Sequence, residues 1–262
     1  MIEIDTELIK EIAGRNERID GRPFGRYRDI KIQKNFILLA EGSAQVRIGD
    51  TEVVAGVKFG TGEPFQDTPD EGVLMVSAEL LPLASPEFES GPPGAQAIEL
   101  ARVVDRAIRE SKCIDFKKLA INPEKVWMIY VDIDVLDDDG NLIDAASLAS
   151  AAALSSAQIP ALDEDGKINI GKKTGPLPMS GLPISTTFVK INNRLMADPN
   201  IAEYKAMDAR LTVGTINTKD GIKLCSMQKG GSSGLTIEEV EQIIEMAIEK
   251  GEELRQLVKE AQ

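Results

Sequence analysis

The feature that most constrains the fold is a long strand followed by a helix of small residues. Residues 126–135 form a run of mainly β-branched and aromatic side chains, and a polar turn follows at residues 137–141. Residues 143–158 are rich in alanine and serine, whose small side chains let a helix pack close against a sheet. We therefore predict a sheet backed by helices, and we interpret this strand, turn and helix as half of a crossover unit.

Apolar patterns predict further strands and helices along the chain. One hairpin joins residues 45–48 to 51–57 through Gly49-Asp50, and another joins 209–217 to 221–227 through the turn that begins at Thr218. Strands are also expected at 73–81 and 183–191, with a turn-rich connection at 163–178. Two terminal helices are predicted: residues 5–14, with Leu8, Ile9 and Ile12 on one side, and a helix from the Thr236–Glu239 capping box to about Lys259.

Composition excludes several classes of function. The 262 residues allow one large domain or two smaller ones. A net charge of -13 argues against broad, nonspecific nucleic-acid binding, so any RNA contact must be confined to a basic patch or shared with a more basic partner. The chain has no histidine, which excludes Ser-His-Asp and Cys-His systems and the H-E-x-x-H zinc motif. Carboxylates, lysine, tyrosine or metal-bound water remain for chemistry.

The same sequence indicates a reduced, cytosolic protein. Charged residues among the first ten predict no signal peptide, and the apolar segment 148–159 is too short and too rich in serine and alanine to span a membrane. Cys113 and Cys225 are the only cysteines, so neither a disulfide framework nor a four-cysteine metal site is expected.

A second helix carries an unexpected stripe of positive charge. In residues 95–111 the apolar side chains gather on one side, while Arg102, Arg106 and Arg109 fall within an arc of about 60° on the other. The stripe is either a solvated face paired with Glu99, Asp105 and Glu110, or a surface for phosphate or carboxylate groups.

Three polar loops could suggest ligand sites. Residues 137–141 contain three aspartates, but Val135 and Ala146 stand where a calcium-binding EF-hand loop needs ligands, so we interpret this segment and residues 163–166 as turns. Residues 230–234 could cradle a phosphate through backbone amides, but they lack a Gly-Lys-Ser or Gly-Lys-Thr ending and are interpreted as a loop before the last helix.

The order of segments resembles a known family. The residues that carry the resemblance are Arg18–Arg22, the hairpin from Gly42 to Thr51, the arginine helix, Asp144–Leu148 with Ile159-Pro160, and the C-terminal hairpin. Together they resemble the RNase PH family of phosphorolytic exoribonucleases over nearly the whole chain. Residues 98–106, 144–150 and 226–229 are similar to the branch of non-catalytic ring subunits in the archaeal exosome.

The resemblance implies a fold, partners and a location. It implies an α+β, RNase PH-like fold (ribosomal protein S5 domain 2-like), with two βα halves whose mixed sheets are backed by helices. Residues 1–180 would hold the N-terminal helix and the first domain, and residues 181–262 the second. The chain would form a cytoplasmic hexameric ring of three heterodimers with a catalytic RNase PH-like subunit, contact RNA, and carry cap subunits with RNA-binding domains.

The resemblance also implies that the chain has lost catalysis. Active members bind phosphate with an arginine pair just before the helix, where this chain has Ala95 and Gln96, and their two catalytic acids fall on Tyr204 and Arg210. Their second phosphate cradle corresponds to residues 140–144, which are apolar and then acidic. A phenol and a guanidinium cannot hold a divalent ion, so neither a metal nor a cofactor is expected.

Alternatives remain open at this point. A shifted register could bring Glu203 or Asp208 into the acidic role, which would make the chain an autonomous phosphate-dependent 3'-to-5' exoribonuclease. A homo-oligomeric scaffold without RNA contact is a third possibility.

The resemblance further implies that Arg102 and Arg106 contact RNA at the interface with the catalytic subunit, while Arg109 forms a salt bridge.

Overall fold

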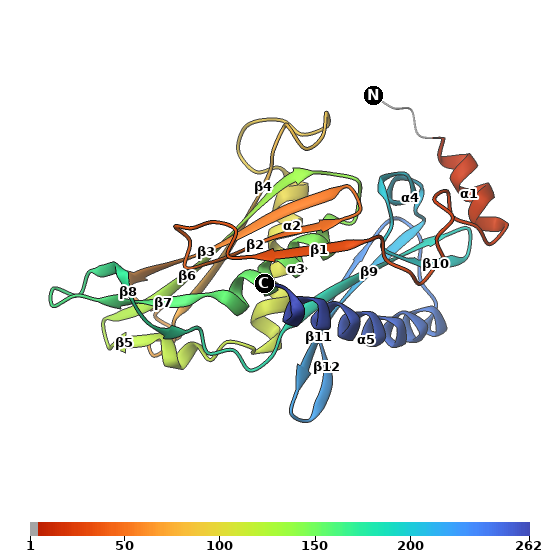
Figure 1. Cartoon of the computed structure of the whole chain (residues 1–262). Helices are drawn as coiled ribbons and strands as arrows, with labels where there is room; N and C mark the ends of the chain where they lie inside the picture. The colour runs from red at the N-terminus through yellow and green to blue at the C-terminus, as the bar shows by residue number, and fades with distance from the viewer. Residues whose placement is uncertain (1–4) are drawn as a thin grey trace.

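The helix of small residues, α3 (Leu142–Ser156), lies between two sheets (Figure 1). The computed structural model describes residues 5–262. Every residue from Leu142 to Leu154 is buried, because one face of α3 contacts β2 (Gly42–Ile48) and β3 (Thr51–Gly62) while another contacts β9 (Pro183–Ile191). The closeness of this packing shows at Gly42, where an added Cβ would lie 2.4 Å from the carbonyl oxygen of Ala153. Larger side chains on α3 would push the sheets apart.

The first sheet is mixed and has six strands. Their order is β1-β2-β3-β6-β4, with β5 paired to β6; the remaining bounds are β1 (Ile30–Lys34), β4 (Val73–Leu80), β5 (Ala120–Asn122) and β6 (Lys125–Asp137). Within residues 5–262, β4 and β6 are the only strands of this sheet that pair in parallel. The chain passes between them through α2 (Ala95–Ser111), the short 3-10 helix η1 (Phe116–Leu119) and β5.

The crossover between parallel strands therefore runs from β4 through α2 to β6, and it comes before the strand, turn and helix that the sequence predicted. The interpretation of β6, its turn and α3 as half of a crossover was wrong, because α3 leads into β7 (Gln158–Leu162), which pairs antiparallel with β8 (Ile168–Pro176) in a separate two-stranded sheet. The strand β8 also occupies most of residues 163–178, where the sequence predicted a turn-rich connection.

The second sheet is entirely antiparallel. Its order is β10-β9-β11-β12, with β10 (Arg194–Ala197), β11 (Ala209–Thr218) and β12 (Gly221–Gly230). The helix α4 (Ile201–Ala206) joins β10 to β11, and α5 (Ile237–Glu260) packs on β9 and β11. The predicted α+β class and the second hairpin are confirmed.

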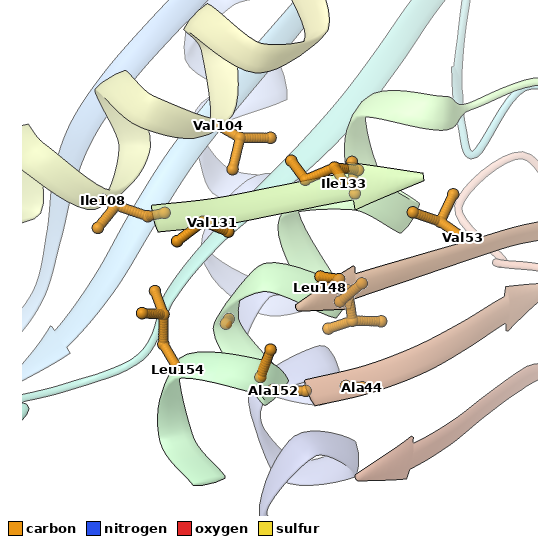
Figure 2. Packing of buried hydrophobic residues seen from close by; sticks show 14 of the residues in the cluster. Ala44, Val53, Val104, Ile108, Val131, Ile133, Leu148, Ala152 and Leu154 are labelled. Atoms are coloured by element: carbon orange, nitrogen blue, oxygen red, sulfur yellow. The ribbon is translucent and has the colours of Figure 1, made fainter. Parts of the chain in front are cut away.

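The core of the first half forms between the sheet and its two long helices. Alternate residues of β6, Ile129, Val131, Ile133 and Val135, are almost completely buried. Figure 2 shows side chains of α2 and α3 gathered around the inner face of this strand, including Val104 and Leu148. Burial of this apolar surface is the main stabilising contribution, and it holds α2 and α3 against the same strand.

The terminal helices differ in part from the predicted pattern. In α1 (Thr6–Gly14), capped by Asp5, the buried side chains are Ile9 and Ala13, whereas Leu8 remains 47% exposed. The helix α1 packs against α4, in the second half of the molecule. Near the opposite terminus, Leu254 and Val258 of α5 join the core of the first half. Within residues 5–262, no helix is long and apolar enough to cross a membrane.

Candidate functional site

Two neighbouring depressions lie where α2 meets the second sheet. The first is a small hollow with a cavity volume of about 40 Å³, lined by Gln96, Tyr204 and Arg210 among others. The second is an open groove of about 610 Å³ between α2 and β12, lined by residues that include Ala95, Arg102 and Arg106. The structure thus brings three of the predicted residues together in the hollow and three in the groove.

Arg210 is buried in the wall of the hollow. Its side chain is only 3% exposed; Nη1 donates to the hydroxyl of Tyr204, and Nη2 forms an ion pair with Glu99. The guanidinium carbon also lies 5.7 Å from the centre of the Tyr204 ring. Burial raises the pKa of the Tyr204 phenol above its usual value, so the phenol stays neutral and accepts the hydrogen bond.

This arrangement does not fit a divalent cation. Two carboxylates line the hollow, but Glu99 is paired with Arg210 and Asp138 accepts the Gly140 amide. The buried guanidinium repels a metal ion, and a cavity of about 40 Å³ holds only a few water molecules. Among residues 5–262 there is no cluster of three or more histidine, cysteine or carboxylate side chains that could hold a metal. The hollow therefore does not suit a divalent metal ion.

The two alternative acids lie outside the hollow. Glu203 is buried and forms an ion pair with Arg18, whose Nε also donates to it at 2.8 Å. The same carboxylate completes the capping box of α4 with Asn200. Asp208 forms a 3.2 Å ion pair with Lys10 of α1. Both carboxylates are thus used to attach the N-terminal segment to the second half.

The aspartate-rich turn at residues 137–141 is bonded to protein groups. Asp138 accepts a 2.9 Å hydrogen bond from the amide of Gly140, and Asp139 pairs with Arg28 at 3.0 Å. Asn141, at the N-terminus of α3, donates to Asp198 at 2.8 Å and to Asp144 at 2.9 Å. These contacts give the segment a structural role at the junction of the two halves.

Asp144 faces the protein interior. Its carboxylate accepts a 2.7 Å hydrogen bond from Tyr27 and bonds of 2.9 and 2.7 Å from the amide and hydroxyl of Thr187. Burial raises the pKa of Asp144 to about 6, although these hydrogen bonds and that of Asn141 partly oppose the change. The acidic residue that ends the apolar turn thus joins α3 to β9.

The three arginines of α2 have different environments. Arg109 donates to Asp105 at 2.7 Å and to the carbonyl of Leu74 at 3.1 Å, so its side chain is held against the first sheet. Arg106 is exposed and lies 3.5 Å from Glu110. Arg102 is also exposed and has no ion pair within the described part of the chain. The two groove arginines are therefore more available to a ligand than Arg109.

Sequence reasoning missed the role of Glu99. It treated Glu99 as a partner for arginines on its own helix, but the structure directs this carboxylate to Arg210 on β11 and within 3.4 Å of the Gln228 amide on β12. It also missed Asp198, which binds two arginines of the segment before β1. The unusual arginine at position 210 was the available signal, since a buried guanidinium requires a carboxylate partner.

Comparison with known proteins decides the family. A model of the 3' exoribonuclease family, domain 1, matches residues 26–160, and the model of its domain 2 matches residues 181–250. The chain belongs to this RNase PH family. The resemblance inferred from its segments is thereby confirmed.

Relatives of this RNase PH family member match over almost their full length. The exosome complex component Rrp42 of Thermococcus kodakarensis is 46% identical over 265 residues, covering 100% of this chain and 96% of the relative. Rrp42 of Methanocella arvoryzae is 48% identical over 255 residues, covering 97% and 95%.

Solved structures give the same result for the fold. A chain of the Archaeoglobus fulgidus exosome with RNA bound to the active site superposes with a TM-score of 0.88 and 46% identity, covering 96% of each chain. A chain of an archaeal exosome core superposes with a TM-score of 0.85 and 42% identity, covering 97% and 96%. The RNase PH-like fold is therefore shared along nearly the whole chain.

Proposed function

We propose that this protein is a non-catalytic subunit of an archaeal exosome core. In this proposal it forms a cytoplasmic hexameric ring of three heterodimers with a catalytic RNase PH-like subunit, structures that subunit's active site, and contacts RNA during 3'-to-5' phosphorolysis. Cap subunits with RNA-binding domains would complete the assembly. The relatives named Rrp42 and the likeness to archaeal exosome structures support this role.

The observation that carries the non-catalytic assignment is the Arg210 cluster. Where the family resemblance expects a carboxylate, a buried guanidinium binds Tyr204 and Glu99 and leaves little space in the hollow. Glu203 and Asp208, which could have replaced the missing acids, pair instead with Arg18 and Lys10. At the two positions where the resemblance expects catalytic acids, this chain therefore offers a phenol and a guanidinium.

The RNA contact is assigned to Arg102 and Arg106. These exposed side chains lie one helical turn apart, with about 5–6 Å between Cβ atoms, a separation that suits neighbouring phosphates of a flexible single strand. The groove beside them is open and contains further hydrogen-bonding side chains, among them Ser226 and Gln228. Guanidinium groups contact phosphate without reading base identity, so we expect little sequence preference.

The deciding experiment uses a ring reconstituted from this chain and a catalytic RNase PH-like subunit. Replacing Arg102 and Arg106 together by glutamate should weaken RNA binding by at least about tenfold. It should also make the slope of log affinity against log salt concentration shallower, by the amount expected for the loss of roughly one to two phosphate contacts. The mass of the assembled complex should still be that of the intact ring. The matched control replaces Lys172 and Lys173, exposed on β8, by glutamate and should bind RNA almost as before. Unchanged affinity in the arginine variant would contradict the assignment.

The rival function, an autonomous phosphate-dependent exoribonuclease, is tested in the same preparation. The isolated chain, incubated with RNA, phosphate and magnesium, should leave the RNA at full length, whereas the ring should release nucleoside diphosphates. Shortening of RNA by the isolated chain would establish the rival. A ring that forms only from copies of this chain and does not crosslink to RNA would instead support a scaffold.

A further inference from the structure

The carboxylate of Glu99 joins three elements that are distant in sequence. Glu99 belongs to α2, and it accepts hydrogen bonds from Arg210 of β11 and from Gln228 of β12, the latter at 3.4 Å. Its side chain lines both the hollow and the groove. Glu99 is therefore the point at which the helix that carries Arg102 and Arg106 is bonded to the second sheet.

The Arg210 end of this contact is rigid. The guanidinium is almost completely buried, donates a second hydrogen bond to Tyr204, and lies across Gly230 of the neighbouring strand. An added Cβ on Gly230 would be 2.8 Å from Nη2 of Arg210, so a larger residue at position 230 would displace the guanidinium from this position. A charged side chain enclosed in this way has few alternative rotamers and provides a fixed anchor.

The position of Glu99 on α2 relates this anchor to the groove. Arg102 follows Glu99 by three residues and Arg106 by seven, which places them about 4.5 and 10.5 Å further along the helix axis. The groove lies between this part of α2 and β12. A bond that holds the start of this stretch against β11 and β12 therefore helps to set the width of the groove beside both arginines, together with the buried apolar face of α2.

We propose that the Glu99–Arg210 ion pair is a clamp that positions Arg102 and Arg106 for RNA. Glu99 and Arg210 are thus positioning residues, and the guanidinium that prevents metal binding in the hollow acquires a function of its own. This inference rests on the proposed RNA contact of the two groove arginines.

The clamp and simple electrostatics predict opposite changes in RNA affinity when the charge of Glu99 is removed. Glu99 carries a negative charge at the edge of an RNA groove, so removing this charge would by itself strengthen RNA binding. If Glu99 positions the arginines, the same removal weakens binding, because the charge-assisted bond to Arg210 is lost. The direction of the change separates the two explanations.

The test measures RNA affinity of the reconstituted ring with Glu99→Gln, a substitution that keeps the size of the side chain. We expect binding weaker by about fivefold. The matched control is Glu110→Gln, which removes one negative charge from the same helix beside Arg106 without touching Arg210. It should leave affinity unchanged or up to about twofold tighter. A Glu99→Gln ring that binds RNA as tightly as the unaltered ring, or more tightly, overturns the clamp.

A second variant covers the case in which an unpaired buried guanidinium prevents folding. Glu99→Gln combined with Arg210→Met removes both charges of the pair, and the clamp predicts that RNA binding remains weak although ring mass is normal. Affinity equal to that of the unaltered ring overturns the proposal. If the variant of Arg102 and Arg106 loses RNA binding but the Glu99 variants do not, the clamp is wrong and the proposed RNA contact is kept. If the arginine variant also binds normally, the proposed RNA contact itself is wrong.

Discussion

Replacement of Asp198 by asparagine should strongly destabilise the protein. Asp198 is completely buried, and its carboxylate receives three hydrogen bonds from Arg28 at 2.8 to 2.9 Å, one from Arg22 at 2.8 Å and one from Asn141 at 2.8 Å. The two arginines precede β1 and Asp198 follows β10, so the cluster joins the two halves of the molecule. Asp198 has a φ of +49°, a left-handed conformation that asparagine also adopts, so the substitution tests the charge with little added backbone strain.

The size of the effect follows from the titration of this carboxylate. Burial alone would raise the pKa of Asp198, but the hydrogen bonds and charge of Arg28 outweigh burial and lower the pKa from 3.8 to about 2. This difference corresponds to roughly 2–3 kcal/mol of stability at neutral pH. Asparagine also removes one of the two carboxylate partners of each of two largely buried arginines, since Arg22 keeps Asp20 and Arg28 keeps Asp139. The expected loss is therefore about 3–4 kcal/mol.

Urea unfolding of the full chain at several pH values measures this loss. Because the folded-state pKa is lowered, the stabilisation is present above about pH 4 and is lost as the pH falls through 2. The difference in unfolding free energy between the unaltered chain and Asp198→Asn should therefore shrink as the solution is acidified. The control is Asp220→Asn, an exposed carboxylate 3.3 Å from Lys223, with an expected loss below about 0.5 kcal/mol. A loss below about 1 kcal/mol in the Asp198 variant at pH 7 would refute the reasoning.

Two further predictions concern buried titratable groups. Burial raises the pKa of Asp144 to about 6, so this residue contributes most to stability below about pH 4, and the contribution is lost as the pH rises through 6. In urea unfolding, the stability advantage of the unaltered chain over Asp144→Asn should therefore shrink between these pH values. A difference that stays constant with pH would contradict this prediction. Burial also raises the pKa of the Cys113 and Cys225 thiols to about 11, so neither should react appreciably with iodoacetamide at pH 8 until the chain is unfolded. Rapid labelling of the folded chain, detected by mass spectrometry, would disprove this.

Local features of the fold were predictable because they depend on residues close together in the sequence. The period of α2, the hairpin around Gly49-Asp50 and the capping box at Thr236 are each specified by fewer than about twenty residues. The position of the parallel pair was not predictable in the same way. The choice between β4 and β7 as the crossover partner depends on where α3 fits, and that helix needed two sheets to bury its surface.

In the candidate site, too, the positions of the residues along the chain were predictable, but their long-range partners were not. Family resemblance aligned Tyr204, Arg210 and Gln96 with active-site positions, and the structure brings all three into one hollow. It did not indicate which carboxylate would neutralise Arg210, since Glu99 lies 111 residues away and the chain contains 43 acidic side chains. Charge alone does not distinguish among so many candidates; only packing brings one of them within hydrogen-bond distance.

The sequence by itself determined that no imidazole chemistry is available, because the chain has no histidine, and that position 210 carries a guanidinium. Only the tertiary structure decided what the remaining charges do. Glu203 and Asp208 bind Arg18 and Lys10, while Glu99 binds Arg210. The physical reason is that a buried charge requires a partner of opposite sign, and the fold determines which partner is within reach.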